Sequence, residues 1–230
     1  MTISSLSENI AQIRNRVRVK SAKSPISSRS VRIVAASKSQ PAAFLKEAAA
    51  LGVCEFGENY LQEALPKMDI LQGFHLTWHF IGPLQSNKAK GVAERFDWIH
   101  SVDRLSIAQK LSDRRPDCLK PLNVCVQVNI SYEDTKSGCK PEELPNLLEA
   151  INSLPRLRLR GLMVIPAAAD NAKEIERAFQ ATRTLFDHSK ATIPNLDTLS
   201  MGMSADFELA IEQGANMVRL GTALFGPRNR

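Results

Sequence analysis

Short runs of β-branched and apolar residues alternate with segments of helical periodicity along this chain of 230 residues. The eight strand-like runs cover residues 31–37, 53–56, 77–82, 98–102, 122–130, 159–165, 196–200 and 217–221. Apolar residues recur at helical spacing in residues 41–52, 59–73, 103–113, 141–154, 174–186 and 204–214. Because parallel neighbours in a sheet need crossover connections, this alternation predicts a parallel sheet with helices between its strands.

Eight parallel strands can close a barrel whose interior is filled by side chains. The length suits one (β/α)8 TIM barrel, so we expect an α/β fold with a single domain over residues 1–230. A helix over residues 5–20 precedes strand one. We expect it to cover the seam that a helix after strand eight would normally cover. A doubly wound open sheet is the alternative, and it would lack the usual GxGxxG turn.

The positive charge of the chain is concentrated at its N-terminus. Residues 1–32 hold seven basic residues and one acid, which accounts for the whole net charge of +6. The remainder of the chain is neutral. We therefore expect a solvated basic helix face, and nucleic-acid binding through this helix is the less favoured alternative.

Other features of the sequence concern its location and assembly. No apolar run approaches the roughly 18 residues that a membrane span requires, and the N-terminus has no apolar signal region. The four cysteines form no CxxC pair, as in a reducing compartment. His75 and His79 are four residues apart, but the segment TWHFIG reads as a strand, so no metal site is expected. We expect a cytoplasmic monomer without a membrane anchor.

Lys38 follows the first strand, where functional groups of parallel barrels gather. By two-residue alternation it shares a face with Ala36 and Val34. If that face looks into the barrel, desolvation favours the neutral amine, which can attack an aldehyde to form a Schiff base. For a lysine considered alone, an exposed position just past the strand is the simpler interpretation.

The ends of strands seven and eight carry groups that suit a phosphate. These are the hydroxyls of Ser200, Ser204 and Thr222 and the backbone N–H groups of Gly221 and Thr222. Ser204 is also predicted to be the N-cap of the helix that follows it. Together with Lys38, the set suggests a phosphate ester that bears an aldehyde. A Schiff-base aldolase acting on sugar phosphates is one alternative.

Eight sequence blocks stand in the order in which a known family has them. They are AASKSQP, FGENYLQEALPKM, WHFIGPLQSNK, IHSVDR, VNISYEDTKSGC, RGLMVIP, LSMGMSADFELAI and VRLGTALFG. Together they resemble the YggS/PROSC family of pyridoxal phosphate homeostasis proteins, whose fold resembles the N-terminal barrel of alanine racemase. The resemblance implies that pyridoxal 5′-phosphate (PLP) is held as a Schiff base on Lys38. It also implies cofactor contacts from Asn59, Ser200, Ser204, Arg219, Gly221 and Thr222.

By the same resemblance Arg219 faces the pyridine nitrogen of PLP. A guanidinium only donates hydrogen bonds, so this nitrogen should stay unprotonated and the ring should be a poor electron sink. In alanine racemase, the resemblance implies a second domain, which supplies a catalytic tyrosine to the active site of the dimer partner. This chain ends at Arg230. We therefore expect no catalytic residue, and a non-catalytic regulator that buffers PLP and supplies PLP-dependent apo-enzymes. The alternative is a fold-type III enzyme such as an amino-acid racemase.

Two further side chains lie near the predicted mouth of the barrel. Tyr60 stands beside Asn59 at a helix start, and Lys136 lies in the loop after strand five. Lys136 is a candidate auxiliary amine for transfer of PLP. For both residues the simpler interpretations, packing for Tyr60 and a solvated loop for Lys136, are favoured.

Overall fold

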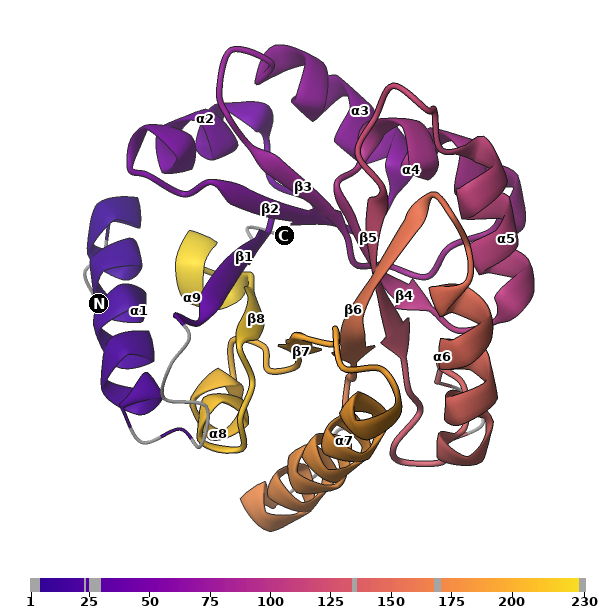
Figure 1. The fold of residues 1–230 in the computed structure, drawn as a ribbon. Helices are drawn as coiled ribbons and strands as arrows, with labels where there is room; N and C mark the ends of the chain where they lie inside the picture. The colour runs from indigo at the N-terminus through magenta and orange to yellow at the C-terminus, as the bar shows by residue number, and fades with distance from the viewer. Residues whose placement is uncertain (1–4, 23, 25–29, 134–135, 168–170, 228–230) are drawn as a thin grey trace.

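The computed structural model describes residues 5–22, 24, 30–133, 136–167 and 171–227. Eight parallel strands close into a barrel in sequence order, with helices forming a ring around it (Figure 1). The strands are β1 (Arg32–Ala36), β2 (Glu55–Glu58), β3 (Thr77–Phe80), β4 (Trp98–Val102), β5 (Leu122–Gln127), β6 (Leu157–Met163), β7 (Thr198–Ser200) and β8 (Met217–Leu220). Each strand overlaps one of the eight predicted runs, so the predicted barrel is confirmed.

The connecting helices also follow the predicted pattern. They are α1 (Leu6–Ser21), α2 (Ala42–Ala50), α3 (Leu61–Ile70), α4 (Ala89–Arg95), α5 (Leu105–Arg114), α6 (Leu144–Asn152), α7 (Ala172–Thr192), α8 (Phe207–Glu212) and α9 (Thr222–Phe225). Two 3-10 turns, η1 (Ser86–Lys88) and η2 (Pro141–Glu143), precede α4 and α6. The sequence analysis did not predict α4 and α9. Both are too short to show a helical period.

Helix α1 covers the seam of the barrel, as predicted. Its capping box joins Ser5 and Glu8, and each bonds to the backbone of the other. The helix packs against α8 and α9 and lies between α2 and α8 in the ring (Figure 1). It buries Leu6, Ile10, Ile13 and Val17. The seam is therefore closed by an apolar helix face from the N-terminal part of the chain.

Two basic residues of α1 form ion pairs with the neighbouring helix α8. Arg16 forms an ion pair of 2.8 Å with Glu208, and Lys20 forms one of 2.6 Å with Glu212. Both acids belong to α8, so the two helices are complementary in charge. Part of the positive charge of α1 is thus used within the chain.

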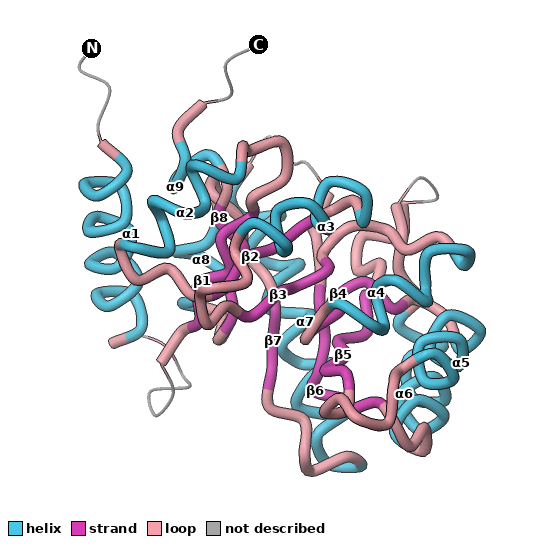
Figure 2. The backbone as a smooth tube through the Cα atoms, turned by 90° about the horizontal axis from the view of Figure 1, so that it is seen from above, coloured by secondary structure: helices cyan, strands magenta, loops and turns pink. Residues whose placement is uncertain are grey.

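The helices lie around the outside of the strands (Figure 2). The core accordingly has an outer layer between strands and helices and an inner layer inside the barrel. The inner apolar cluster is formed by Val34, Trp98, Cys125, Met163 and Met217. All four cysteines are free thiols, two of them buried. Among the described residues, no helix combines the length and the apolar character needed to cross a membrane.

Candidate functional site

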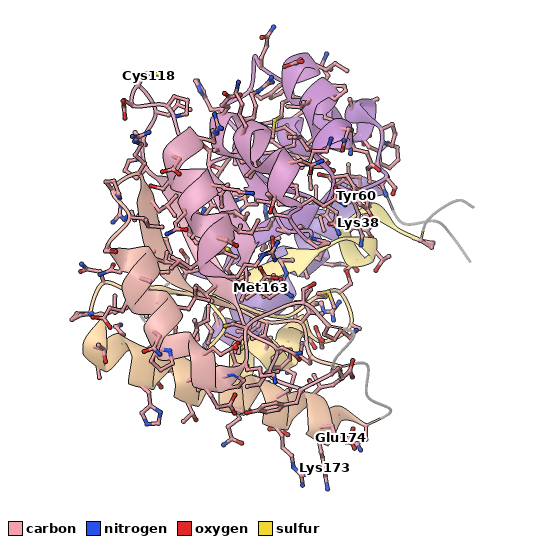
Figure 3. All side chains as sticks on the ribbon, turned by 90° about the vertical axis from the view of Figure 1, so that its right-hand side faces the viewer. Lys38, Tyr60, Cys118, Met163, Lys173 and Glu174 are labelled. Atoms are coloured by element: carbon pink, nitrogen blue, oxygen red, sulfur yellow. The ribbon has the colours of Figure 1, made fainter. Side chains whose placement is uncertain are left out.

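The predicted site residues lie on, or directly follow, four contiguous strands: β7, β8, β1 and β2. Strand β8 pairs with β1, so Arg219 lies opposite Val34 in the sheet. This pairing brings residues nearly 200 positions apart in the sequence to one end of the barrel. Lys38 and Tyr60 lie at that end, on the same side as the first residues of α7, and Cys118 lies at the opposite end (Figure 3).

Lys38 stands two residues beyond β1, and its side chain is half-buried. Val34 belongs to the inner cluster and Ala35 to the outer one, so the face of β1 that carries Val34 and Ala36 looks into the barrel. Ser39 follows in the left-handed region with φ of 62°. The chain turns sharply there and directs the lysine to the mouth of the barrel.

Helix α3 holds the two residues that flank Lys38. The ammonium of Lys67 donates to the carbonyl of Ser37 at 2.9 Å and pairs with Glu58 at 2.7 Å. Ser37 donates its hydroxyl to the same carboxylate at 2.6 Å. Burial raises the pKa of Glu58, although the bonds from Lys67 and Ser37 oppose the shift. This buried cluster anchors the backbone just before Lys38.

On the far side of Lys38, the N–H of Ser39 donates to the Glu63 carboxylate at 3.2 Å. Both anchors come from the helix that follows β2. The position of Lys38 therefore depends on β2 and α3 as much as on its own strand.

Asn59 directly follows β2, the strand that pairs with β1 just before Lys38. Its amide oxygen, Oδ1, is buried and accepts no hydrogen bond from the described residues. Gly82 packs on its backbone so closely that a Cβ there would lie 2.4 Å from the Asn59 carbonyl oxygen. Ser101 in turn donates to the Gly82 carbonyl. Asn59 is thus held by its backbone and leaves an acceptor for a ligand.

Ser204 does not cap the helix that follows it, so that prediction is wrong. Asp206 is the N-cap residue of α8, and its carboxylate accepts from the N–H of Met203 at 2.6 Å. The hydroxyl oxygen of Ser204 accepts instead from the N–H groups of Gly221 and Ala223, at 3.2 and 3.1 Å. Both serine and aspartate are good caps, so the sequence alone could not decide between them.

The predicted phosphate-binding groups are partly bonded to one another in this structure. The Gly221 N–H, which we expected to face a phosphate, donates to Ser204. The hydroxyl proton of Ser204 is not used in these bonds and stays available as a donor. Thr222 is exposed at the start of α9. The Ser204 hydroxyl proton is therefore free to donate, whereas the Gly221 N–H is already used within the protein.

Arg219 is a buried cation at this end of β8, only 4% exposed. It donates from Nη1 to the Ser200 hydroxyl at 2.7 Å and from Nη2 to the Val164 carbonyl at 2.9 Å. It forms no ion pair with an acidic residue of the described ranges. Burial lowers its pKa to about 10. Two of its five N–H groups are used by the protein, which leaves donors for a ligand.

Two histidines behind Ser200 were not predicted as part of the site. His100 Nδ1 lies 2.9 Å from the Ser200 hydroxyl, and His79 Nδ1 lies 2.9 Å from His100 Nε2. Their alternation with outward residues in TWHF and WIHSV could have suggested an inward position. Which residues they contact depends on the closed barrel, so it could not be predicted.

The two peripheral candidates lie in exposed positions. Tyr60 is 56% exposed at the start of α3. Lys136 lies in the loop between β5 and α6 and forms an ion pair of 4.0 Å with Glu133. Lys136 agrees with the solvated-loop interpretation, whereas the side chain of Tyr60 is not packed into the core.

The chain was compared with known sequence families and with curated proteins. The profile of the alanine racemase N-terminal domain matches residues 3–229. A pyridoxal phosphate homeostasis protein of Pseudomonas aeruginosa is 52% identical over 227 residues, 99% of this chain and 97% of that protein. The protein of the same name from Escherichia coli is 47% identical over 230 residues, 97% of each chain.

Solved structures with a similar fold include a relative of the same kind and an alanine racemase. PipY of Synechococcus elongatus, determined with PLP bound, has a TM-score of 0.84 at 37% identity, covering 96% of this chain and all of that one. Alanine racemase of Corynebacterium glutamicum has a TM-score of 0.70 at 16% identity. It covers 97% of this chain, which spans 62% of the racemase, so this likeness concerns the fold alone.

Proposed function

The chain belongs to the family of pyridoxal phosphate homeostasis proteins, and from that membership we propose that it binds PLP and buffers the free cofactor in the cell. The observation that carries the proposal is that a half-buried amine, Lys38, and a buried cation, Arg219, belong to two neighbouring paired strands at one end of the barrel. We further propose that the bound PLP is passed to PLP-dependent apo-enzymes.

The side chains at the mouth suit the groups of this cofactor. When bound, PLP supplies an aldehyde, a phosphate and a pyridine nitrogen. The Nζ of Lys38 would hold the aldehyde carbon of PLP as a Schiff base, with loss of one water. Ser204 donates its hydroxyl proton to the phosphate, with Thr222 and the backbone around Gly221 beside it. Arg219 would donate to the ring nitrogen, and the amide of Asn59 would bond to another polar group of PLP.

Two observations favour this fit over an empty polar surface. The buried Oδ1 of Asn59 has no partner among the described residues, and the buried guanidinium of Arg219 has hydrogen bonds there but no acidic partner, and both arrangements are costly. Arg219 lies on β8 and Asn59 directly follows β2, and both strands pair with the strand that precedes Lys38. A planar ligand with acceptors and donors on its rim would satisfy both.

We propose that the protein is not an amino-acid enzyme. Arg219 has no acceptor to stabilise a protonated ring nitrogen, so the ring withdraws electrons weakly. No described tyrosine is anchored over the mouth, since Tyr60 is exposed and Tyr132 donates to Glu142 in the β5–α6 loop. Incubation with D- and L-amino acids should give no turnover faster than that of free PLP mixed with the Lys38→Ala variant.

We propose one barrel per chain as the binding unit, a monomer in the cytoplasm. Four free thiols agree with a reducing compartment. Sedimentation equilibrium should give a mass close to 25.4 kDa.

Binding is tested by titrating the ligand-free protein with PLP and following its absorption spectrum. Wild type should develop a new band near 420 nm, roughly where PLP bound to an amine absorbs, and Lys38→Ala should not. Lys136→Ala is the matched control, because it removes an exposed loop lysine at the same end of the barrel. A new band in Lys38→Ala as strong as that of wild type, or loss of the band in Lys136→Ala alone, would contradict the assignment.

Transfer is tested separately from binding. The loaded protein is mixed with a PLP-dependent apo-enzyme, and recovery of that enzyme's activity is followed with and without an added trap for free PLP. Recovery that persists with the trap supports direct transfer. Recovery abolished by the trap would show that the protein only releases PLP into solution.

A further inference from the structure

Polar side chains cross the inside of the barrel, where bulky apolar residues usually form the layers. His79 and His100 are completely buried there. Trp78 and Phe80 pack outward on either side of His79, so the imidazole points into the barrel. Buried polar groups of this kind need partners. Their partners form a continuous path through the interior.

The path runs from β8 to β2. Arg219 Nη1 lies 2.7 Å from the Ser200 hydroxyl, and this oxygen lies 2.9 Å from His100 Nδ1. His100 Nε2 lies 2.9 Å from His79 Nδ1. His79 Nε2 lies 3.2 Å from the Glu55 carboxylate, at the amino end of β2. The path links the cofactor end of the barrel to its opposite end.

One assignment of protons satisfies every contact along this path. The Glu55 carboxylate can only accept, so His79 carries its proton on Nε2. The two atoms are close, but their alignment does not meet the geometry of a regular hydrogen bond. Nδ1 of His79 then accepts, and His100 must donate from its own Nε2. Nδ1 of His100 accepts from the Ser200 hydroxyl, whose oxygen accepts from Arg219. Every bond therefore points from Arg219 toward Glu55.

Burial keeps both rings neutral, as this assignment requires. Burial lowers the pKa of His79, against the opposing effect of Glu55. The pKa of His100 lies well below its usual value, first because of burial and then because His79 and Arg219 repel a further positive charge. A protonated ring would place a donor against a donor and break the sequence of bonds.

We propose that His79 and His100 are positioning residues, which hold the Arg219 guanidinium at the cofactor through this hydrogen-bond chain. The inference rests on the proposed function, since that function assigns Arg219 to the pyridine nitrogen. It also changes the role of Ser200. The single hydroxyl proton of Ser200 is directed at His100, so Ser200 orients Arg219 and does not donate to the phosphate.

The proton assignment is tested first, in wild-type protein without PLP. Long-range proton–nitrogen NMR of the imidazoles should show both buried rings protonated on Nε2 alone. The exposed His75 and His188 provide internal comparison in the same spectrum. A proton on Nδ1 of either buried ring would contradict the proposed chain of hydrogen bonds. This result does not depend on whether the protein binds PLP.

The positioning role is tested with His100→Phe, which keeps a ring but removes both nitrogens. We expect PLP to bind about 10-fold more weakly and the absorption band of bound PLP to shift. His100→Gln offers an acceptor and a donor, so it should restore the wild-type band position. Cys125→Ala is the matched control, because Cys125 is also buried inside the barrel but takes no part in the chain of hydrogen bonds.

The outcomes separate the two proposals. If wild type does not bind PLP, the proposed function fails, and the NMR result still decides whether the chain exists. If wild type binds PLP and His100→Phe keeps its affinity and band position, the positioning role is wrong. Equal effects in His100→Phe and Cys125→Ala would also overturn it, because they would reflect a loosened barrel interior.

Discussion

At the scale of single residues, Arg115 shows how one buried cation can join two helices. It is 4% exposed and donates to three carbonyls, those of Ala93, Phe96 and Lys120, at 2.6 to 2.8 Å. Two of these carbonyls lie at the end of α4. Such carbonyls have no partner within a helix, so Arg115 satisfies them from the end of α5.

Replacing Arg115 by Met should lower the free energy of unfolding by about 2–4 kcal/mol, because charged hydrogen bonds to buried carbonyls are lost. The measurement is chemical denaturation at neutral pH. Arg104→Met is the control, since Arg104 pairs with Asp103 at the surface and should cost less than about 1 kcal/mol. Equal effects of the two changes would show that Arg115 has no special role.

The two buried histidines predict how stability depends on pH. Their pKa values lie below the usual 6.5 in the folded protein, so below pH 6.5 the unfolded chain binds more protons than the folded one. The free energy of unfolding should therefore fall as the pH drops below 6.5, with a slope approaching about 2.7 kcal/mol per pH unit for two protons. Denaturation between pH 5 and pH 8 measures this slope.

His100→Gln should roughly halve that slope, because one of the two titrating groups is gone. The lowered pKa of Glu55 acts below the usual carboxyl value of 4.5, outside this range, whereas the raised pKa of Glu58 acts above 4.5 and opposes the effect of the histidines. A free energy of unfolding that does not change between pH 7 and pH 5.5 would show that the histidines are not held neutral by the fold.

At the scale of elements, α1 is a part of the barrel rather than an appendage. Its apolar face is buried against α8 and α9, whereas its ion pairs with α8 are largely solvated. Burial of apolar area contributes more to stability than exposed ion pairs do. The helix should therefore be held by its apolar residues and oriented by its charges.

Ile13→Ala should lower the free energy of unfolding by about 2–4 kcal/mol, since Ile13 is 2% exposed. Arg16→Gln should lower it by less than about 1 kcal/mol, because the side chain of Arg16 is 48% exposed in its ion pair with Glu208. Thermal denaturation of the two variants gives the comparison. A larger loss for Arg16→Gln would mean that charge, rather than apolar burial, attaches α1.

Elements with a long period or strong β character could be predicted from the sequence, and the shortest could not. The run VRIVAAS and the spacing in EIERAFQATRTLF each indicate one structure. Helix α4 has only seven residues, including Gly91, and α9 has four. Their formation depends on packing against neighbours that periodicity does not show.

At the scale of the whole molecule, closure of the barrel makes the site. Strand β1 pairs with β8, which places Val34 opposite Arg219 and brings Ala36, two residues before Lys38, beside Gly221. The sequence placed Lys38, Ser204 and Arg219 at strand ends, and the strand count favoured closure. It could not show that Ser204 bonds to Gly221, or that Ser200 meets His100, because these contacts join strands that only the closed barrel brings together.

The central claim is that Lys38 is the amine that holds PLP, and reduction with borohydride tests it most directly. The protein is loaded with PLP, reduced and digested, and the peptides are mapped by mass spectrometry. The account predicts a pyridoxyl group on the peptide that contains Lys38 and none on the peptide that contains Lys136. A modified Lys136, or another lysine, beside an unmodified Lys38 would contradict it.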